Sequence, residues 1–470
     1  MMIPPAEIIL HLENIIPGCE TLSDLARRHG KELFLVGGAL RDLLRGSPLH
    51  DLDFACRQED LGFWQEKLPE FFSGRFISMG TRAQRFQTLR LVRTGALTVD
   101  LAVLEGNCLE SDLRRRDFTV NAMAFGLHDR IFHDPFAGRR DLEKREIVII
   151  SDENLKADPL RIVRAARFML ELEGSLPETT RLAMTEATPG LERVARERFT
   201  VELNHIFSHP ESFRALETLV TTGALQIILP PLAGLEGLTQ NNYHHLDALQ
   251  HTLAMGRELD RLCQSPPLGL PVPDPDSRIL LKWAGLLHDT GKALTRTVDP
   301  DTGIIHFYGH ERFSTHLARE TLKHFALGKP FLARLERLIE NHLRPLQLSL
   351  GQSKEKGLRR LVFDLEDDLG LLLLHALADL EATRGRNPAP RREALLKLCR
   401  ELLAIHKKER EKFIKPLLNG RDLIALGMEP GPGMGVVIKL IHQRQIAGEI
   451  ENRDQALAAA EQLLSNKNSP

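Results

Sequence analysis

The sequence predicts an α+β protein, in which an N-terminal α/β unit is followed by a mostly helical remainder. Residues 31–150 mix short strand-like runs with helical segments, whereas strand signals nearly vanish after Asn154. The chain has 470 residues, too many for one hydrophobic core, so we expect several domains. Boundaries near residues 150, 230 and 385 give four regions: 1–150, 151–230, 231–385 and 386–470.

The expected elements follow from apolar spacing and turn residues. The predicted strands of the first region are 33–38, 51–56, 86–93, 96–104 and 145–150. Further along the chain, apolar residues at helical spacing predict helices at 158–174, 371–385 and 392–408.

Composition excludes several classes of protein. The chain is 42% hydrophobic and 27% charged, and we find no run near the roughly 20 apolar residues that cross a bilayer. The N-terminal apolar run contains Glu7 and has no basic lead, so we expect no signal peptide, no membrane and a cytoplasmic location. The five cysteines form no Cys-x-x-Cys pair, which favours reduced thiols.

Net charge is −2, but residues 384–415 hold eleven Lys/Arg against four Asp/Glu, a local charge of 11 − 4 = +7. This count fits a polyanionic partner and fits a solvated helix face equally well.

Asp51 and Asp53 lie one residue apart in the predicted strand 51–56. Since strand side chains alternate between faces, both carboxylates project to the same side. Carboxylates so placed repel each other unless a cation lies between them, and hard oxygen ligands suit Mg²⁺. The pair therefore predicts a magnesium site.

Gly37 and Gly38 lie between the predicted strand 33–38 and a helix that begins near Ala39. Glycines at such a junction let backbone N–H groups and a helix N-terminus approach a phosphate. Either signal alone would as readily be an ordinary turn, but together they predict a triphosphate with its metal, as in two-metal nucleotidyl transfer. Asp100, the lone acid of the apolar run 96–104, is the expected third carboxylate.

The segments VGGALRD and DLDF resemble the signature of class II tRNA nucleotidyltransferases, the family of CCA-adding enzymes and bacterial poly(A) polymerases. Later segments resemble further family motifs in order: LRRRDFTVNAMAF (113–125), DPFAGRRDLEKREI (134–147), ADPLRIVRAARF (157–168) and ERFTVELNHIF (197–207). The resemblance implies a polymerase β-like head, Mg²⁺ as cofactor, and tRNA, CTP and ATP as partners. The implied activity adds C, or C and A, to the tRNA 3′ end without a nucleic-acid template.

One motif also makes physical sense as a base reader. Asp158, Arg161, Arg164 and Arg167 recur every three residues, which on the predicted helix makes one slowly winding stripe, with Phe168 expected to pack behind it. By resemblance, Asp158 and Arg161 would read the Watson–Crick edges of CTP and ATP, and the other two arginines would lie nearer the phosphates or base.

The resemblance assigns the remaining nucleotide contacts residue by residue. It implies that Arg116 contacts the nucleotide and that Asp117 and Asn121 shape the ribose pocket. Arg41 and Asp42 belong to the same implied site, within the glycine-containing motif. Without the resemblance, the charged stripe would be interpreted as a solvent-facing helix.

The sequence departs from the family between Leu104 and Leu113, where only EGNCLESD is present. CCA-adding relatives usually have a longer loop there, associated with the switch from C to A addition. The shortening resembles CC-adding enzymes and disfavours a poly(A) polymerase, which remains an alternative.

A second constellation lies in residues 243–379, in the segments YHHLDALQHTL, LLHDTGKAL, HFYGHERFSTH, IENHLRP and LLHALADLEA. These segments resemble the HD metal-dependent phosphohydrolase superfamily. The resemblance gives six candidate ligands: His251, His288, Asp289, His310, His342 and Asp379. Imidazole with carboxylate suits a transition metal such as Mn²⁺, Ni²⁺ or Fe²⁺, which would activate water against phosphoesters such as RNA ends.

Residues 415–460 resemble the C-terminal region that follows HD domains in bacterial tRNA nucleotidyltransferases. With the basic segment before it, this region is expected to contact the phosphate backbone of the tRNA elbow. A protein whose main activity is HD hydrolysis and a silent RNA-binding module remain alternatives, the second disfavoured because the acids and Arg116 are all present.

Overall fold

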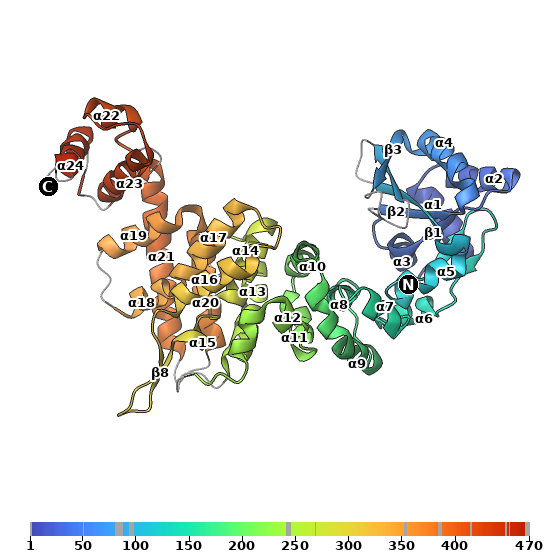
Figure 1. Ribbon diagram of the computed structural model, residues 1–470, viewed down its shortest axis with the longest axis horizontal. Helices are drawn as coiled ribbons and strands as arrows, with labels where there is room; N and C mark the ends of the chain where they lie inside the picture. Colours follow the sequence, from blue (N-terminus) through green and yellow to red (C-terminus); the bar gives the residue numbers. More distant parts are fainter. Residues whose placement is uncertain are drawn as a thin grey trace. The chain divides into compact units, whose positions relative to one another are not determined.

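The computed structural model describes residues 2–49, 51–79, 88–93, 98–240, 246–267, 269–351, 355–383, 388–413, 416–446, 449–450 and 452–465 (Figure 1). Contacts divide the chain into two compact units, Met1–Glu202 with Thr218–Ile227, and Leu203–Glu217 with Ile228–Pro470. The division into four regions stays a prediction, and its boundary at 385 lies outside the described residues.

The first unit is built on a mixed seven-stranded sheet with the order β3-β4-β5-β2-β1-β6-β7. Its strands are β1 (Phe34–Val36), β2 (Asp51–Cys56), β3 (Gly74–Met79), β4 (Thr88–Arg93), β5 (Thr98–Val103), β6 (Ala124–Gly126) and β7 (Phe132–His133). Strands β2 and β5 run parallel, and their register sets Asp53 beside Asp100. Leu52 and Phe54 are buried, as the predicted alternation along β2 requires.

The helices of this unit are short. They are α1 (Ile8–Ile15), α2 (Cys19–His29), α3 (Gly37–Arg45), α4 (Leu61–Phe72), α5 (Leu109–Arg114), α6 (Gly138–Lys144), α7 (Asp152–Ala157), α8 (Arg161–Glu171) and α9 (Glu178–Ala187). Helix α3 packs against β1, β2 and β6, and its Leu40, Leu43 and Leu44 are buried. This packing fixes the junction between β1 and α3 next to the carboxylates of β2.

Three sequence expectations fail in this unit. The segment 145–150 forms isolated bridges, Phe118 to Ile149 and Glu146 to Ser175, instead of a strand. Strands β3, β6 and β7 were not expected, because each is short or lacks a clear alternation. Helix α8 begins at Arg161, so Asp158 precedes it in an extended conformation (φ −136°, ψ 87°), since Pro159 disfavours helical geometry in the residue before it.

The second unit is mostly helical. Helices α10 (Arg196–Ser208), α11 (Ser212–Thr221) and α12 (Ala224–Ile228) carry the chain between the two units. The others are α13 (Ala248–Gln264), α14 (Pro275–Leu287), α15 (Lys292–Thr295), α16 (His310–Leu322), α17 (Lys329–Asn341), α18 (Arg344–Leu350), α19 (Glu355–Leu365), α20 (Leu369–Ala382), α21 (Pro388–Phe413), α22 (Gly420–Ala425), α23 (Pro432–Ile446) and α24 (Arg453–Ser465).

Helix α20 is the centre of the second unit. Almost every residue from Leu369 to Ala382 is buried, as expected for a helix that is apolar on all sides. A two-stranded hairpin that the sequence did not predict, β8 (Arg296–Val298) with β9 (Ile305–Phe307), extends from the helices around it (Figure 1). Among the described residues, no helix combines the length and apolar composition needed to cross a membrane.

Candidate nucleotide and metal sites

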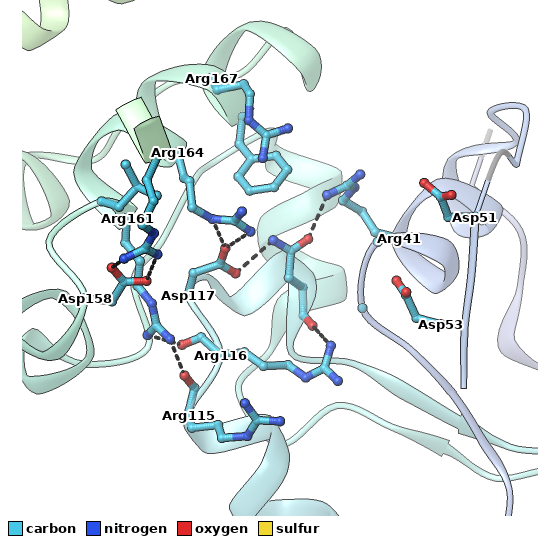
Figure 2. A pocket seen from close by; sticks show the side chains of 16 residues that line it. Arg41, Asp51, Asp53, Arg115, Arg116, Asp117, Asp158, Arg161, Arg164 and Arg167 are labelled. Atoms are coloured by element: carbon cyan, nitrogen blue, oxygen red, sulfur yellow. Dashed lines mark hydrogen bonds and ion pairs between the residues drawn. The ribbon is translucent and has the colours of Figure 1, made fainter. Parts of the chain in front are cut away.

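A cavity of about 570 Å³ opens in the first unit beside β2 (Figure 2). It is lined by residues from the β1–α3 junction, β2, the segment 115–121, α8 and α10: Gly37, Gly38, Arg41, Asp51, Asp53, Arg115, Arg116, Asp117, Asn121, Asp158, Leu160, Arg161, Arg164, Arg167, Phe168 and Arg198. The lining holds seven arginines and four aspartates, a formal excess of 7 − 4 = +3. The cavity is therefore suited to an anion that brings its own cation.

Asp51 and Asp53 lie on the same side of β2 and both reach the cavity (Figure 2). Burial raises the pKa of Asp53 to about 6; the Arg116 charge opposes this shift, and the neighbouring Asp100 and Asp51 add to it. A carboxylate with a raised pKa beside another carboxylate is stabilised in its charged form by a cation. The chemistry of this pair fits the expected Mg²⁺.

Gly37 begins α3 with φ +69°, a left-handed conformation that favours glycine. A Cβ atom at this position would lie 2.7 Å from Arg116 Nη1 and 3.5 Å from Asp53 Oδ2. The glycine thus lets the backbone approach the arginine and the aspartate closely, and it leaves the N–H groups of the first turn of α3 at the cavity wall.

Asp100 lies beside Asp53 in the sheet but does not line the cavity. Both its carboxylate oxygens accept hydrogen bonds from Arg90 on β4, at 2.8 Å from Nε and 2.8 Å from Nη2. A metal would have to compete with this bidentate pair. The role of Asp100 as a third ligand stays a prediction.

A chain of polar contacts runs through the centre of the cavity wall. Arg41 Nη1 donates to Asn121 Oδ1 at 2.8 Å, and Asn121 Nδ2 donates to Asp117 Oδ1 at 2.9 Å. Asp117 Oδ2 then accepts from Arg164 at 2.6 Å and 3.0 Å. Although burial would raise the pKa of Asp117, the Arg164 charge and these hydrogen bonds lower it.

This series of polar contacts ends at an acidic residue on each side. Asp42 pairs with Arg41 at 2.8 Å and 2.9 Å but does not itself line the cavity. Buried Glu202 accepts from Arg164 at 3.4 Å and from Arg167 at 2.7 Å. These carboxylates hold the guanidinium groups in fixed directions, which is the arrangement that suits repeated binding of an anion.

Asp158 and Arg161, the predicted base readers, are held by separate partners. Asp158 accepts two hydrogen bonds from Arg198 of α10, whereas Arg161 donates to the carbonyl oxygens of Arg115 and Arg116 at 2.7 Å and 3.1 Å. Both side chains line the cavity, and their polar groups face it from the side opposite Asp51 and Asp53 (Figure 2).

The second unit brings all six predicted HD residues together. His251, His288 and Asp289 form one group whose candidate ligand atoms lie within 4.8 Å of one another, and Asp289, His310 and His342 form a second. Asp379 joins the first group through His251 Nε2, 2.8 Å from Asp379 Oδ1. Asp289 belongs to both groups, so it would contribute to either metal site.

Backbone carbonyls fix the ring protons of three of these histidines. The Nδ1 atoms of His288, His310 and His342 lie 2.9, 2.8 and 2.7 Å from the carbonyl oxygens of Gly285, Phe307 and Ile339. Because a carbonyl only accepts, each Nδ1 carries a proton, so Nε2 is the ring nitrogen that would bind a metal. This is the donor set of a transition-metal centre.

The electrostatics of the cluster agree with a cation. Burial would raise the pKa of Asp289, but the charges of His288 and Lys292 hold it well below its ordinary value. Burial lowers the pKa of His342, and the neighbouring His288 and His310 lower it further. Lys292 Nζ lies 2.6 Å from Asp289 Oδ2, so this ammonium group partly compensates the charge of the buried carboxylate.

Models of known families match four segments of the chain. They are the poly A polymerase head domain (residues 33–148), the probable RNA and SrmB-binding site of polymerase A (175–235), the HD domain (244–381) and the putative tRNA nucleotidyltransferase domain 2 (370–460).

Two relatives match along nearly their whole length. An A-adding tRNA nucleotidyltransferase of Deinococcus radiodurans is 34% identical over 90% of this chain and 94% of its own. A CC-adding tRNA nucleotidyltransferase of Thermus thermophilus is 34% identical over 91% and 93%. The chain belongs to the class II tRNA nucleotidyltransferases. It carries the HD domain that the sequence predicted.

Solved structures of CCA-adding enzymes share the fold of this tRNA nucleotidyltransferase. The Thermotoga maritima CCA-adding enzyme complexed with tRNA is 19% identical, with a TM-score of 0.60 over 97% of this chain and 98% of that one. A CCA-adding enzyme in complex with ATP is 21% identical, with a TM-score of 0.63 over 98% and 97%. The predicted α+β class is confirmed.

Sequence reasoning missed several residues of both sites in this tRNA nucleotidyltransferase. In the head cavity they are Arg115, Leu160, Phe168 and Arg198. Phe168 was expected behind α8, but it lines the cavity, and the guanidinium carbons of Arg41, Arg164 and Arg167 lie 5.0, 5.4 and 4.3 Å from its ring centre. Arg198 stands inside the recognised segment 197–207, which was the available signal.

In the HD cavity, the missed residues include Lys292, His306, Phe307 and Arg391, which line it. His375 was missed as well. His375 is fully buried on α20, one turn before Asp379, with its ring centre 5.0 Å from that of His288. The HDTGK segment was the signal for Lys292, and the i, i+4 spacing to Asp379 was the signal for His375.

Proposed function

We propose that the chain adds cytidines to the 3′ end of tRNA from CTP, with the first-unit cavity as its active site. The observation that carries this proposal is that one cavity is lined by both Asp51 and Asp53 and by seven arginines. A nucleoside triphosphate with Mg²⁺ satisfies both sides at once. Membership of the tRNA nucleotidyltransferase family supports the same substrate class.

Residues in different parts of the cavity have different proposed roles. The N-terminus of α3 and the fixed arginines receive the triphosphate, while Asp158 accepts from the base edge and Arg161 lies beside it. The 3′-oxygen of the tRNA attacks the α-phosphorus, its proton leaves, and the bond to the β-phosphate oxygen breaks to release pyrophosphate. Mg²⁺ held by Asp51 and Asp53 would stabilise the attacking oxygen and the leaving group.

The product is proposed from the connection between β5 and α5. Only residues 104–108 separate Val103 from Leu109, and the turn Glu105–Asn107 occupies most of them. Asn107 ties the turn to the head, accepting from the Gln58 N–H at 2.8 Å and donating to Glu59 Oε2 at 2.8 Å. A connection so short and anchored has no room for the longer loop of CCA-adding relatives, which favours CC addition.

Three tRNA substrates test the product directly. Purified protein is incubated with tRNA ending before CCA, after C and after CC, with labelled CTP or ATP supplied separately. Labelling of the first two by CTP alone supports CC addition. If ATP labels the tRNA ending after CC and CTP labels the other two, the enzyme adds complete CCA. If ATP labels that tRNA and CTP labels none, the enzyme adds only A. Long A tails on generic RNA would indicate a poly(A) polymerase.

We further propose that the HD domain hydrolyses phosphoesters at RNA 3′ ends, such as a 2′,3′-cyclic phosphate. The observation favouring this second activity is that Asp289 has the Nε2 atoms of His288, His310 and His342 at 3.2, 3.2 and 4.0 Å. Asp289, His310 and His342 also line a cavity of about 290 Å³. Bound metal would supply activated water, and Lys292 is placed to hold a phosphate oxygen. Hydrolysis that persists in His288→Ala with Asp289→Ala would remove this proposal.

A further inference from the structure

Tyr308 is the most exposed large side chain near the HD cavity. It is 73% exposed, and its ring stacks on His306 with centroids 4.9 Å apart and an interplanar angle of 13°. One face of Tyr308 packs on the imidazole, and the exposed fraction shows that much of the rest meets solvent.

The stacked pair is joined directly to the metal-binding residues. His306 and Phe307 line the HD cavity together with His310. The Phe307 carbonyl accepts from His310 Nδ1 at 2.8 Å, and Lys292 Nζ lies 5.6 Å from the Phe307 ring centre. The segment that orients a candidate metal ligand therefore also carries the stacked rings.

The stacking places Tyr308 beside a residue of the cavity lining. His306 belongs to β9 and lines the cavity, and Tyr308, just after the strand, stacks on its imidazole. Gly309 follows with φ +73° and turns the chain into α16, whose first residue is His310. His306 thus lines the cavity, and Tyr308 stacks against it.

We propose that the His306–Tyr308 pair is a stacking subsite for a nucleobase. The proposal rests on the hydrolase function proposed above and names its substrate class: a phosphate attached to a nucleoside or RNA 3′ end. The phosphate lies at the metal cluster beside Lys292, and the base continues the stack outside. Aromatic rings bind any base through its π-face, so the subsite selects nucleotides over other phosphoesters without selecting a sequence.

Two cyclic phosphodiesters separate base recognition from catalysis. The full chain loaded with Mn²⁺ is assayed with adenosine 2′,3′-cyclic phosphate and with glycerol 1,2-cyclic phosphate, which has the same five-membered ring and no base. Water attacks phosphorus, one ring P–O bond breaks, and the released oxygen takes the proton. Tyr308→Ala should raise KM for the adenosine ester roughly fivefold or more, with kcat little changed. The glycerol ester should be hydrolysed as by wild type.

Two further variants control for folding. Tyr308→Phe keeps the ring and should behave as wild type. Val298→Ala removes an exposed apolar side chain from β8 of the same hairpin and should change neither substrate. If Tyr308→Ala lowers the hydrolysis of both esters equally, or of neither, the stacking subsite is overturned. The hydrolase proposal is unaffected by that result.

A binding measurement decides the subsite independently of activity. Calorimetric titration compares adenosine 3′-monophosphate with inorganic phosphate on wild type and Tyr308→Ala. The subsite predicts weaker nucleotide binding in the variant and unchanged phosphate binding. Equal affinity of both proteins for the nucleotide contradicts it. If wild type hydrolyses neither ester, the hydrolase proposal fails, and this titration alone decides the subsite.

Discussion

Arg198 holds Asp158 with two parallel hydrogen bonds, 3.0 Å from Nη1 to Oδ1 and 2.9 Å from Nη2 to Oδ2. The two residues are 40 positions apart: Asp158 lies between α7 and α8, and Arg198 lies in α10. A bidentate pair of this kind fixes the plane of the carboxylate as well as its place. The orientation of the proposed base reader therefore depends on α10.

Arg198→Ala should loosen nucleotide selection. Without its partner, the Asp158 carboxylate can rotate, and we expect the preference for CTP over UTP to fall about tenfold, corresponding to about 1.4 kcal/mol. Initial rates with each triphosphate on tRNA ending before CCA measure this preference. Arg198→Lys, which restores charge without the fork, should recover it only in part. The exposed Arg193→Ala is the matched control, and unchanged selectivity in Arg198→Ala would show that Asp158 is positioned by other contacts.

The three acids of the sheet should differ in importance. Asp51→Ala and Asp53→Ala should each lower CMP incorporation at least 1000-fold, on the order of 4 kcal/mol, because they remove proposed metal ligands from the cavity. Asp100→Asn should cost about tenfold or less, since Asp100 is bound to Arg90 outside the cavity lining. Binding of tRNA, measured by filter retention, should remain in all three. An Asp100→Asn loss as large as the Asp53→Ala loss would establish Asp100 as a third ligand.

The raised pKa of Asp53 makes the metal-free protein sensitive to pH. Its folded value of about 6 exceeds the ordinary 3.8, so the fold binds this proton more tightly than the unfolded chain. The resulting stabilisation is fully present below about pH 4 and is lost as pH rises through 6. In EDTA at pH 7.5, Asp53→Asn should therefore raise the free energy of unfolding by about 2–3 kcal/mol.

Mg²⁺ binding should favour the charged form of Asp53, whereas burial favours the neutral form. Because the metal binds the charged carboxylate, its affinity should fall as pH drops below 6, and binding should release a proton. Thermal unfolding with and without Mg²⁺ at pH 5.5 and 7.5 measures both effects. Equal stabilisation of wild type and Asp53→Asn by Mg²⁺ would place the ion elsewhere.

The HD cluster should bind metal independently of nucleotide transfer. His310 Nε2 and His342 Nε2 lie 3.3 Å apart, and Asp289 Oδ1 lies 3.2 Å from the first and 4.0 Å from the second, so three candidate ligand atoms surround one point. Either His310→Ala or His342→Ala should reduce the Mn²⁺ retained after dialysis, measured by elemental analysis, while CMP incorporation stays within twofold of wild type. His316→Ala, an exposed histidine of the same helix, is the matched control. Full metal retention in both cluster variants would contradict the assignment.

Local sequence patterns predicted the parts of the sites that depend on neighbouring residues. The shared side of Asp51 and Asp53 follows from strand alternation, and the position of Gly37 follows from its place before a helix. The six HD residues were placed through the resemblance, and the structure brings them into one cluster. The predicted strand 145–150 failed because apolar composition alone does not provide a pairing edge.

The sequence by itself predicted the α+β class and the shared side of the acid pair, because periodicity and strand alternation are local properties. The family and the set of HD residues came from the resemblance of short segments to known motifs. Tertiary structure alone decided the partners of those residues. It set Arg90 on Asp100, Arg198 on Asp158, and the ring of Phe168 under three arginines. Such contacts depend on sheet register and helix packing between distant segments, and the energy of a charged group is set by the neighbours that burial brings to it.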